Sequence, residues 1–192
     1  MGSETRDRIV DSSTELFSRR GYSGTGIKQI VAEARAPFGS IYHFFPGGKE
    51  ALGEEVIRWS GARFGELVPL IFDGASDVVA GVEAFFSGAA QTVRDSDFAD
   101  PCPIATITLE TASDSEPMRQ ASADVFSAWV ELAGARFVAA GVGDADAREL
   151  AIAIIAALEG AFILCRAWRT TDALDAAGAA MADRLRSLLG TS

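Results

Sequence analysis

The sequence is poor in the residues that most often carry catalysis or bind metal ions. It has one histidine, His43, and two cysteines, Cys102 and Cys165, which lie 63 positions apart. These three residues cannot supply the cluster of ligands that a zinc site needs, and no nucleophile stands beside an obvious base. We therefore expect a protein that is not an enzyme and that holds no cofactor and no metal.

Other absences bear on where the protein works. Two distant cysteines form no disulfide framework, and reduced, buried thiols are typical of a cytoplasmic protein. The first residues, MGSETRDRIVDSS, lack the apolar segment of a secretory signal. No apolar run approaches the roughly 20 residues that span a bilayer. We expect a cytoplasmic protein without a membrane partner.

Lysine is scarce, and charge is distributed unevenly along the chain. The formal net charge is −10, yet both lysines, Lys28 and Lys49, lie near the N-terminus. Residues 1–53 carry 7 basic and 6 acidic residues, whereas residues 54–192 carry 10 and 21. A locally basic surface on an acidic body suits a polyanionic partner, although such a segment is also typical of an ordinary solvated face.

Apolar residues recur at helical spacing almost throughout, and nothing reads as a strand. With 48% hydrophobic residues, the chain can bury a substantial core. The pattern predicts an all-α protein of about nine helices. They cover about 5–20, short segments from Thr25 and from Pro37, then 49–66, 76–95, 102–113, 116–140, 145–169 and 171–189. The sequence DSDFADPCP, residues 95–103, is the clearest loop.

The two short helices form a helix-turn-helix, because only about three residues, RAP, join them. In that motif the second helix enters the DNA major groove. Phe38 is suited to a thymine methyl, and Gly39 and Ser40 are small enough to let the backbone approach base edges. Tyr42 and His43 can donate hydrogen bonds to phosphates. The structural alternative is that Tyr42 and His43 are ordinary residues of the surface or of the rim of the core.

Thr25 and Lys49 each lie at an expected helix N-terminus, where free N–H groups and the helix dipole favour an anion. Each residue also has a structural explanation that involves no anion. Thr25 would only cap its helix, and Lys49 would be an ordinary solvated charge. The GGKE sequence at 47–50 also suggests a phosphate-binding loop. A Walker A motif would need glycine at position 43 and Ser or Thr at position 50, where the chain has His43 and Glu50, so that interpretation fails.

The run TELFSRRGYSGTGIKQIVAEARAPFGSIYHFFPGGKEAL, residues 14–52, resembles the DNA-binding domain of TetR-family transcriptional repressors. The family pattern joins a phenylalanine before a glycine–aromatic pair, a threonine, Gly-x-Ile/Leu-Tyr-x-x-Phe and Lys-Glu-x-Leu. The matching positions are Phe17, Gly21–Tyr22, Thr25, Gly39–Ser40–Ile41–Tyr42, Phe45 and Lys49–Glu50–Ala51–Leu52. Compared with the family pattern, one extra residue separates Phe45 from Lys49, which resembles the LmrA/YxaF-type subgroup. The sequence CPIATITLE at 102–110 is also similar to that subgroup.

The resemblance implies a homodimer that binds a palindromic operator in double-stranded DNA and is released by a small-molecule inducer. It implies a helix-turn-helix domain over 1–53 and a ligand-binding and dimerisation domain over 54–192. The implied DNA contacts are to phosphates from Thr25, Lys28, Tyr42, His43 and Lys49, and to bases from Phe38, Gly39 and Ser40. Arg35 departs from the family, because it replaces the usual glycine of the turn and so adds a DNA-backbone contact or strain.

The larger domain offers two candidate surfaces. The helix at 145–169 is apolar nearly all round and the last helix has a stripe of small residues, so we expect a dimer interface from Ile154, Leu158, Cys165, Trp168, Leu174, Gly178, Met181 and Leu185. An apolar or aromatic inducer would meet Phe64, Phe85, Phe86, Glu110, Phe126, Trp129, Phe162 and Arg166. Glu110 and Arg166 belong to this set because a charged residue amid apolar sequence needs a partner, which a surface ion pair would also provide.

A second function class stays open, namely a helical small-molecule-binding or scaffolding protein without DNA activity. In such a protein, Tyr42, His43 and Lys49 would have no effect on DNA affinity. The sequence specifies neither the operator nor the inducer, and it does not separate repression from activation.

Overall fold

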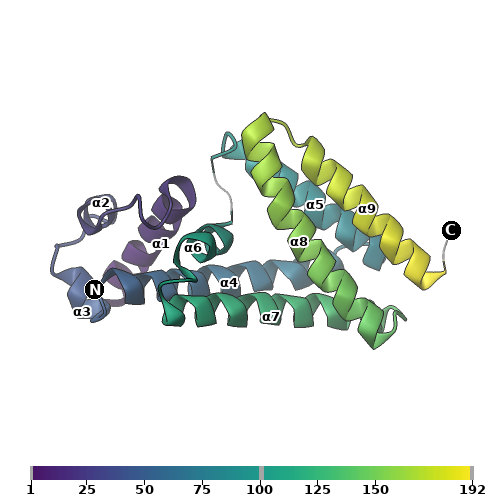
Figure 1. Ribbon diagram of the computed structural model, residues 1–192, viewed down its shortest axis with the longest axis horizontal. Coiled ribbons are helices and arrows are strands. Elements are labelled where there is room, and N and C mark those ends of the chain that lie inside the picture. Colours follow the sequence, from purple (N-terminus) through teal and green to yellow (C-terminus); the bar gives the residue numbers. More distant parts are fainter. Residues whose placement is uncertain (1, 100–101, 191–192) are drawn as a thin grey trace. The chain divides into compact units, whose positions relative to one another are not determined.

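The computed structural model describes residues 2–99 and 102–190, and its regular secondary structure there is α-helix alone, as the sequence predicts (Figure 1). The helices are α1 (Gly2–Arg20), α2 (Ile27–Glu33), α3 (Ser40–Phe44), α4 (Lys49–Asp73), α5 (Val78–Asp95), α6 (Pro103–Thr111), α7 (Glu116–Ala139), α8 (Asp144–Trp168) and α9 (Asp172–Leu189). The expected loop at 95–103 separates α5 from α6, and its residues 100–101 lie outside the described part of the chain.

Contacts divide the chain into two compact units. The first runs from the N-terminus to Ala62 and includes the later segment that ends at Val125; the second takes Arg63–Ala99 and the residues from Phe126 onward. The division expected from the sequence, between residues 53 and 54, assigned α6 to the C-terminal domain. The contacts instead place α6 in the first unit, where it packs against α1.

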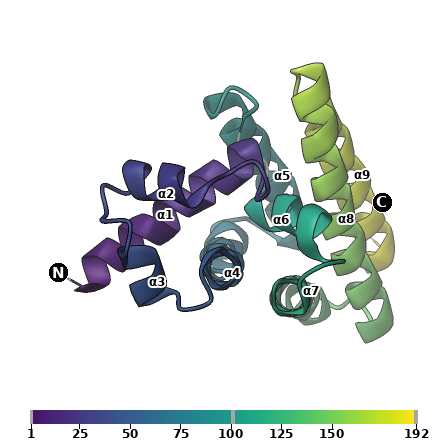
Figure 2. The same cartoon turned by 60° about the vertical axis from the view of Figure 1, so that its left-hand side comes forward.

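In the first unit, α1 packs against both α2 and α3 (Figure 2). Ile9, Phe17, Ile30 and Ile41 are completely buried in this packing. The end of α1 is the predicted one, because Gly21 adopts φ +79° and its N–H donates to the Phe17 carbonyl at 2.9 Å. Glycine is favoured at such a left-handed helix end because it has no Cβ.

The two short helices begin later than the sequence suggests. The N-cap of α2 is Gly26 rather than Thr25, and its N–H donates to Oε1 of Gln29 at 3.0 Å. The third helix has Gly39 as its N-cap instead of starting at Pro37. The Pro37 carbonyl accepts a hydrogen bond from the Ser40 N–H at 2.9 Å, so residues 37–39 form a tight turn ahead of the helix.

The fourth helix continues to Asp73, beyond the predicted end near residue 66, although Pro69 lies inside it. Proline removes one backbone hydrogen bond and commonly bends a helix. Packing on either side of Pro69 offsets this cost, because Val68 is buried and Phe72 packs against Phe137 with ring centroids 6.3 Å apart. Tertiary burial thus overrides the local signal.

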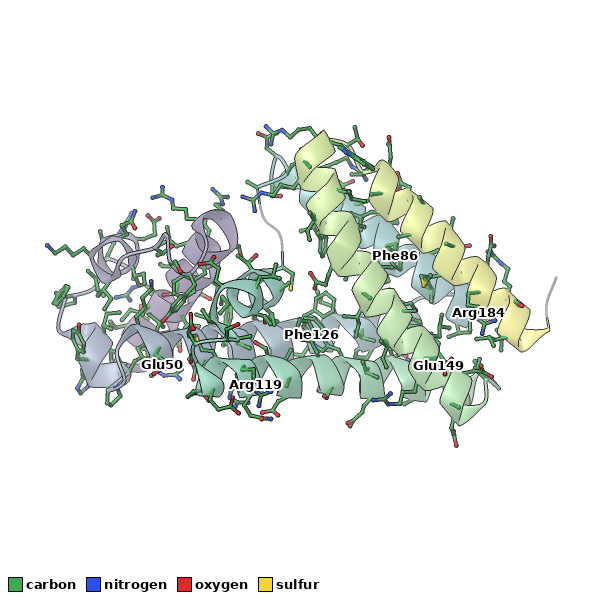
Figure 3. The ribbon with its side chains drawn as sticks, in the orientation of Figure 1. Glu50, Phe86, Arg119, Phe126, Glu149 and Arg184 are labelled. Atoms are coloured by element: carbon green, nitrogen blue, oxygen red, sulfur yellow. The ribbon has the colours of Figure 1, made fainter. Side chains whose placement is uncertain are left out.

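The second unit has its own core, in which α9 packs against both α5 and α8. The core takes Phe86 and Val93 from α5, Leu150 and Leu158 from α8, and Leu185 from α9. Figure 3 labels Phe86 on α5. These contacts bury only part of the apolar surface of α8, so one side of that helix stays exposed.

The expectation that no apolar run reaches membrane-spanning length is wrong for α8, which is long and apolar enough by length and composition alone. One third of its most apolar window is buried inside the chain. A core helix of a soluble protein passes the same test, so this feature by itself is weak evidence for a membrane span.

Gly178 on α9 allows close packing against α5. A Cβ at this position would lie 2.8 Å from the Cβ of Phe86, whereas one at Gly88 on α5 would meet nothing within 4 Å. We expect Gly178→Ala to destabilise the protein by about 1–3 kcal/mol through overpacking. The matched change Gly88→Ala should stabilise it by about 0.5–1 kcal/mol, because alanine favours a helix. Urea unfolding of both variants checks this, and equal midpoints would contradict the packing argument.

Candidate DNA-binding surface

The turn before α3 and α3 itself present a row of exposed side chains. Phe38 is 49% exposed and Tyr42 is 51% exposed, with their ring centroids 6.1 Å apart. His43 is also exposed, and a Cβ at Gly39 would meet nothing within 4 Å. This face therefore offers an aromatic pair, a phenol, an imidazole and open backbone to a partner. Ser40 is half-buried at the start of α3, and Lys28 is exposed on α2.

Thr25 lies behind this surface. Its side chain is 1% exposed, and its Oγ1 lies 2.8 Å from the Gly21 carbonyl and 3.3 Å from the Leu16 carbonyl. A hydroxyl has a single hydrogen to donate, and these carbonyls accept it. Thr25 thus ties the loop before α2 to the end of α1 and has no exposed hydroxyl for a phosphate.

Lys49 is half-buried at the start of α4. Its Nζ donates to the Tyr22 carbonyl at 2.6 Å and lies 4.1 Å from the centroid of the Tyr22 ring. Burial lowers the pKa of Lys49, and the nearby Glu110 carboxylate partly offsets this by raising it. The sequence suggested a free cation at this helix start, whereas the structure commits the ammonium group to Tyr22.

The turn between α2 and α3 is held from α1 and contains a strained residue. Nε of Arg8 donates to the Ala34 carbonyl at 3.1 Å, which ties α1 to the C-terminal end of α2. The next residue, Arg35, adopts φ +49°, in the left-handed region that costs a non-glycine residue about 1 kcal/mol or more. This confirms the strain expected where arginine replaces glycine.

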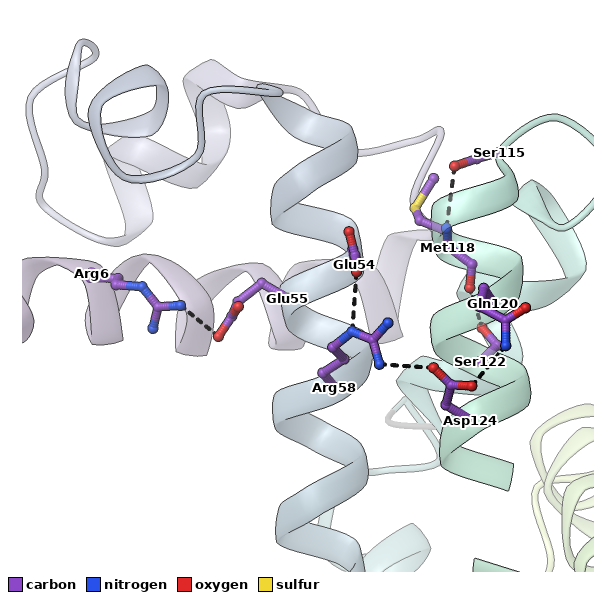
Figure 4. A network of polar contacts seen from close by, with 9 residues as sticks. All are labelled: Arg6, Glu54, Glu55, Arg58, Ser115, Met118, Gln120, Ser122 and Asp124. Carbon is purple, nitrogen blue, oxygen red and sulfur yellow. Dashed lines mark hydrogen bonds and ion pairs between the residues drawn. The ribbon is translucent and has the colours of Figure 1, made fainter. Parts of the chain in front are cut away.

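Ion pairs brace the start of α4 (Figure 4). Arg6 on α1 lies 2.7 Å from Glu55, and Arg58 lies 3.1 Å from both Glu54 and Asp124. The hydrogen bonds that Arg58 donates to Asp124 and then to Glu54 are the main reasons that the pKa of Arg58 is raised. Exposed pairs of this kind contribute little stability each.

Five of the predicted ligand contacts lie together in the second unit. Phe64 is central, with its ring centroid 4.3 Å from that of Trp129 and 5.7 Å from that of Phe85. Phe126 contacts Trp129, and Phe86 contacts Phe85. Of this cluster, Phe86 and Trp129 are buried and the other three rings are half-buried.

The other three candidates are Phe162 and Arg166 on α8 and Glu110 on α6. Phe162 packs against the core of the second unit, and Arg166 is exposed on α8. Glu110 belongs to the first unit, where its carboxylate accepts hydrogen bonds from the N–H groups of Tyr22 and Ser23. The partner that Glu110 needs is therefore a backbone loop of the same chain.

The second unit also has a surface groove between α5 and α9 that the sequence did not indicate. Its volume is about 240 Å³. The lining residues are Glu83, Phe86, Ser87, Leu174, Asp175, Gly178 and Ala179. Phe86 is the only residue that it shares with the predicted ligand contacts.

Six of the eight residues expected at the dimer interface face the interior of their own chain. Each has 5% or less of its surface exposed or is the buried Gly178, and the six are Ile154, Leu158, Cys165, Leu174, Gly178 and Leu185. Such residues cannot contact a second subunit, so this expectation is wrong for them. Trp168 is 59% exposed and Met181 is half-buried. The exposed apolar side of α8 carries Ile152, Ile163, Leu164 and Trp168.

An all-helical chain with a helix-turn-helix on its first unit is the architecture of a helical transcriptional regulator, and comparisons with known proteins agree. Residues 9–56 match the family model of bacterial regulatory proteins of the tetR family. Residues 78–180 match the C-terminal domain of LmrA/YxaF-like transcriptional regulators, which covers more than half of the chain. The chain therefore belongs to the TetR family of transcriptional regulators, which are not enzymes.

Individual relatives point the same way. The HTH-type transcriptional regulator YxaF of Bacillus subtilis (strain 168) is 32% identical over 161 residues, which is 84% of each chain. LmrA of the same organism is 29% identical over 161 residues, covering 84% of this chain and 86% of its own. A regulatory protein TetR from Rhodobacter sphaeroides shares the fold, with a TM-score of 0.85, 24% identity and coverage of 94% and 98%. Regulators of this family bind DNA and typically act as dimers.

The left-handed Arg35 gives a test of stored strain. Glycine adopts φ near +49° without the Cβ penalty, whereas alanine keeps that penalty and also lacks the arginine charge. We expect Arg35→Gly to be more stable than Arg35→Ala by about 1 kcal/mol. Guanidinium unfolding of the two variants measures the difference. If Arg35→Ala proves as stable as Arg35→Gly, the turn stores no strain at this residue.

Proposed function

We propose that this regulator is a cytoplasmic repressor that binds a palindromic operator as a homodimer and leaves it when a small apolar or aromatic ligand binds. The observation that carries the proposal is the exposed row along the turn before α3 and α3 itself, where Phe38, Tyr42 and His43 all point away from the core. Among the relatives, the repressor DhaR of Mycobacterium sp. (strain GP1) is 28% identical over 127 residues. This supports repression as the mode of action.

On this proposal, α3 enters the major groove. Phe38, Gly39 and Ser40 lie at its N-terminal end, where a recognition helix meets base edges. Tyr42, His43 and Lys28 supply hydrogen bonds and charge to the flanking phosphates, which fix position without reading sequence. The buried Thr25 and the half-buried Lys49 contact the loop between α1 and α2 and so support the motif without touching DNA.

The aromatic cluster of Phe64, Phe85, Phe86, Phe126 and Trp129 is the part of the second unit best suited to an apolar or aromatic ligand. Aromatic rings provide large contact areas and prefer tilted or edge-on packing with other rings. Three of the five are half-buried, so they retain surface for a ligand. Release from DNA then requires that the ligand bind more tightly to the form that no longer fits the operator.

The dimer interface that we propose is the exposed apolar side of α8. Leu164 is 41% exposed, Ile163 is 61% exposed and Trp168 is 59% exposed, so this helix presents several large apolar side chains to solvent. Exposed apolar surface of this kind is typical of a protein interface. A second copy of α8 would cover it and would give the two helix-turn-helix motifs the symmetry that a palindrome requires.

A charged residue on this side should separate the subunits. We expect Leu164→Glu to shift the protein to monomer in sedimentation equilibrium, because burying an unpaired carboxylate at an interface is costly. The control is Val138→Glu on α7, because Val138 is equally exposed at 41%. A dimer that survives Leu164→Glu, or one that is lost equally in the control, would place the interface elsewhere.

Selection of bound duplexes from a random DNA pool tests the function itself. We expect an enriched palindrome with half-sites about 34 Å apart, or a multiple of that distance. If about six to eight phosphates are neutralised, the slope of log affinity against log salt concentration should be about −5 to −7.

Lys28→Ala should weaken binding on every sequence and make this slope shallower by about 1 per contact. Arg148→Ala, an exposed base in the second unit, is the control. No enriched palindrome at low salt would contradict the proposal and favour a ligand-binding protein without DNA activity.

A further inference from the structure

One carboxylate holds the loop that joins α1 to α2. Oε1 of Glu110 on α6 accepts a hydrogen bond from the Tyr22 N–H at 3.0 Å, and Oε2 accepts one from the Ser23 N–H at 2.7 Å. Two successive backbone N–H groups that converge on one anion make a backbone nest, and hydrogen bonds to an ionised acceptor are stronger than neutral ones. The loop immediately before the helix-turn-helix is therefore fastened to α6.

Gly21 makes this approach possible. It adopts φ +79°, and a Cβ at this position would lie 2.2 Å from Oε1 of Glu110. A side chain here would collide with the carboxylate as well as strain the backbone. The glycine that ends α1 is thus also the residue that lets α6 reach the loop.

Lys49 holds the same peptide segment from α4. The Tyr22 N–H is bound by Glu110, while the Tyr22 carbonyl accepts from Nζ of Lys49 at 2.6 Å. The ammonium group also lies against the Tyr22 ring, 4.1 Å from its centroid. Tyr22 is consequently fixed from both α6 and α4, and the chain that leaves it leads directly into α2.

We propose that Glu110 and Lys49 are positioning residues for DNA binding, which clamp the loop at Tyr22 and so set the placement of α2 and α3. The inference rests on the proposed function, because it assumes that α3 reads the operator. A clamp that fixes the binding surface in advance spares the protein the ordering cost at the moment of binding. Loss of the clamp weakens specific binding, although neither Glu110 nor Lys49 needs to touch a base.

Charge alone predicts the opposite result for Glu110. Removing a carboxylate beside a basic DNA-binding surface makes the local potential more positive, which strengthens binding to a polyanion. The clamp predicts weaker operator binding after the same change. The sign of the effect therefore separates the two accounts.

The test compares full-length Glu110→Ala with Asp114→Ala by titration of the selected operator and of a scrambled duplex. Asp114 is an exposed acid of the same unit, so its loss removes the same charge. We expect Glu110→Ala to lose roughly tenfold or more in operator affinity, as the loss of hydrogen bonds to a charged group implies, and Asp114→Ala to lose none. Operator affinity of Glu110→Ala that equals or exceeds the wild-type value would overturn the clamp.

Hydrogen exchange of the free protein adds a readout that general loss of stability would not mimic. The Tyr22 and Ser23 amides should exchange faster in Glu110→Ala while the core of the second unit stays protected. Glu110→Gln, which keeps one carbonyl oxygen as an acceptor, should restore part of the operator affinity. If Glu110→Ala does not fold, Glu110→Gln carries the test, and wild-type exchange at Ser23 together with wild-type affinity would overturn the proposal.

The failure of the clamp and the failure of the proposed function give different results. A wild-type protein that selects no palindrome would overturn the proposed function as well, whereas a selected palindrome that a Glu110 variant binds as tightly as the wild type overturns the clamp alone.

Discussion

The surface proposed to read DNA depends on helices that are too short to exist by themselves. α2 has seven residues and α3 has five, whereas isolated helices shorter than about 12–15 residues are marginal in water. Their persistence must come from tertiary contacts. Burial of Ile30 and Ile41 against α1 supplies the apolar part, and the hydrogen bond from Arg8 to the end of α2 supplies a polar part. The proposed specificity is thus a consequence of packing on α1.

This dependence explains how a protein that is acidic overall can bind a polyanion. Scattered positive charge would bind DNA without orientation, because phosphate contacts carry no sequence information by themselves. A rigid motif needs only a few donors at fixed positions, which we propose to be Lys28, Tyr42 and His43. The excess of acid lies after residue 53, where it opposes non-specific binding through other surfaces.

The sequence predicted the order and type of the helices well because helical periodicity and glycine or proline punctuation are local signals. It failed where a distant contact competed with such a signal. Thr25 looked like an N-cap, but carbonyl groups at the end of α1 accept its hydrogen, and Gly26 takes the cap position. The fourth helix was expected to end near residue 66, but burial of Val68 and packing of Phe72 carry it through Pro69 to Asp73.

The site was predictable to different degrees for the same reason. Residues of α3 could be found because the motif is contiguous, and their exposure follows from helical geometry. The residues of the proposed dimer interface could not be predicted, because a helix that is apolar nearly all round, like α8, does not reveal which side meets its own core. The small residues of α9 suggested contact with a second subunit, but Gly178 packs against Phe86 of its own chain.

Glu110 shows that a charged residue in an apolar sequence can be expected to need a partner, although the sequence does not identify that partner. Its neighbours in α6, Leu109 and Thr111, are exposed and buried respectively, so the sequence gives little indication of where its carboxylate reaches. The partner is a pair of backbone N–H groups some 87 positions away, which carry no side-chain signature at all. N–H···O hydrogen bonds in proteins span about 2.7–3.2 Å, so a displacement of α6 that the Glu110 side chain did not follow would break these two bonds and release the loop at Tyr22. On the proposed clamp, the position of α6 and the placement of the helix-turn-helix are therefore coupled within the first unit.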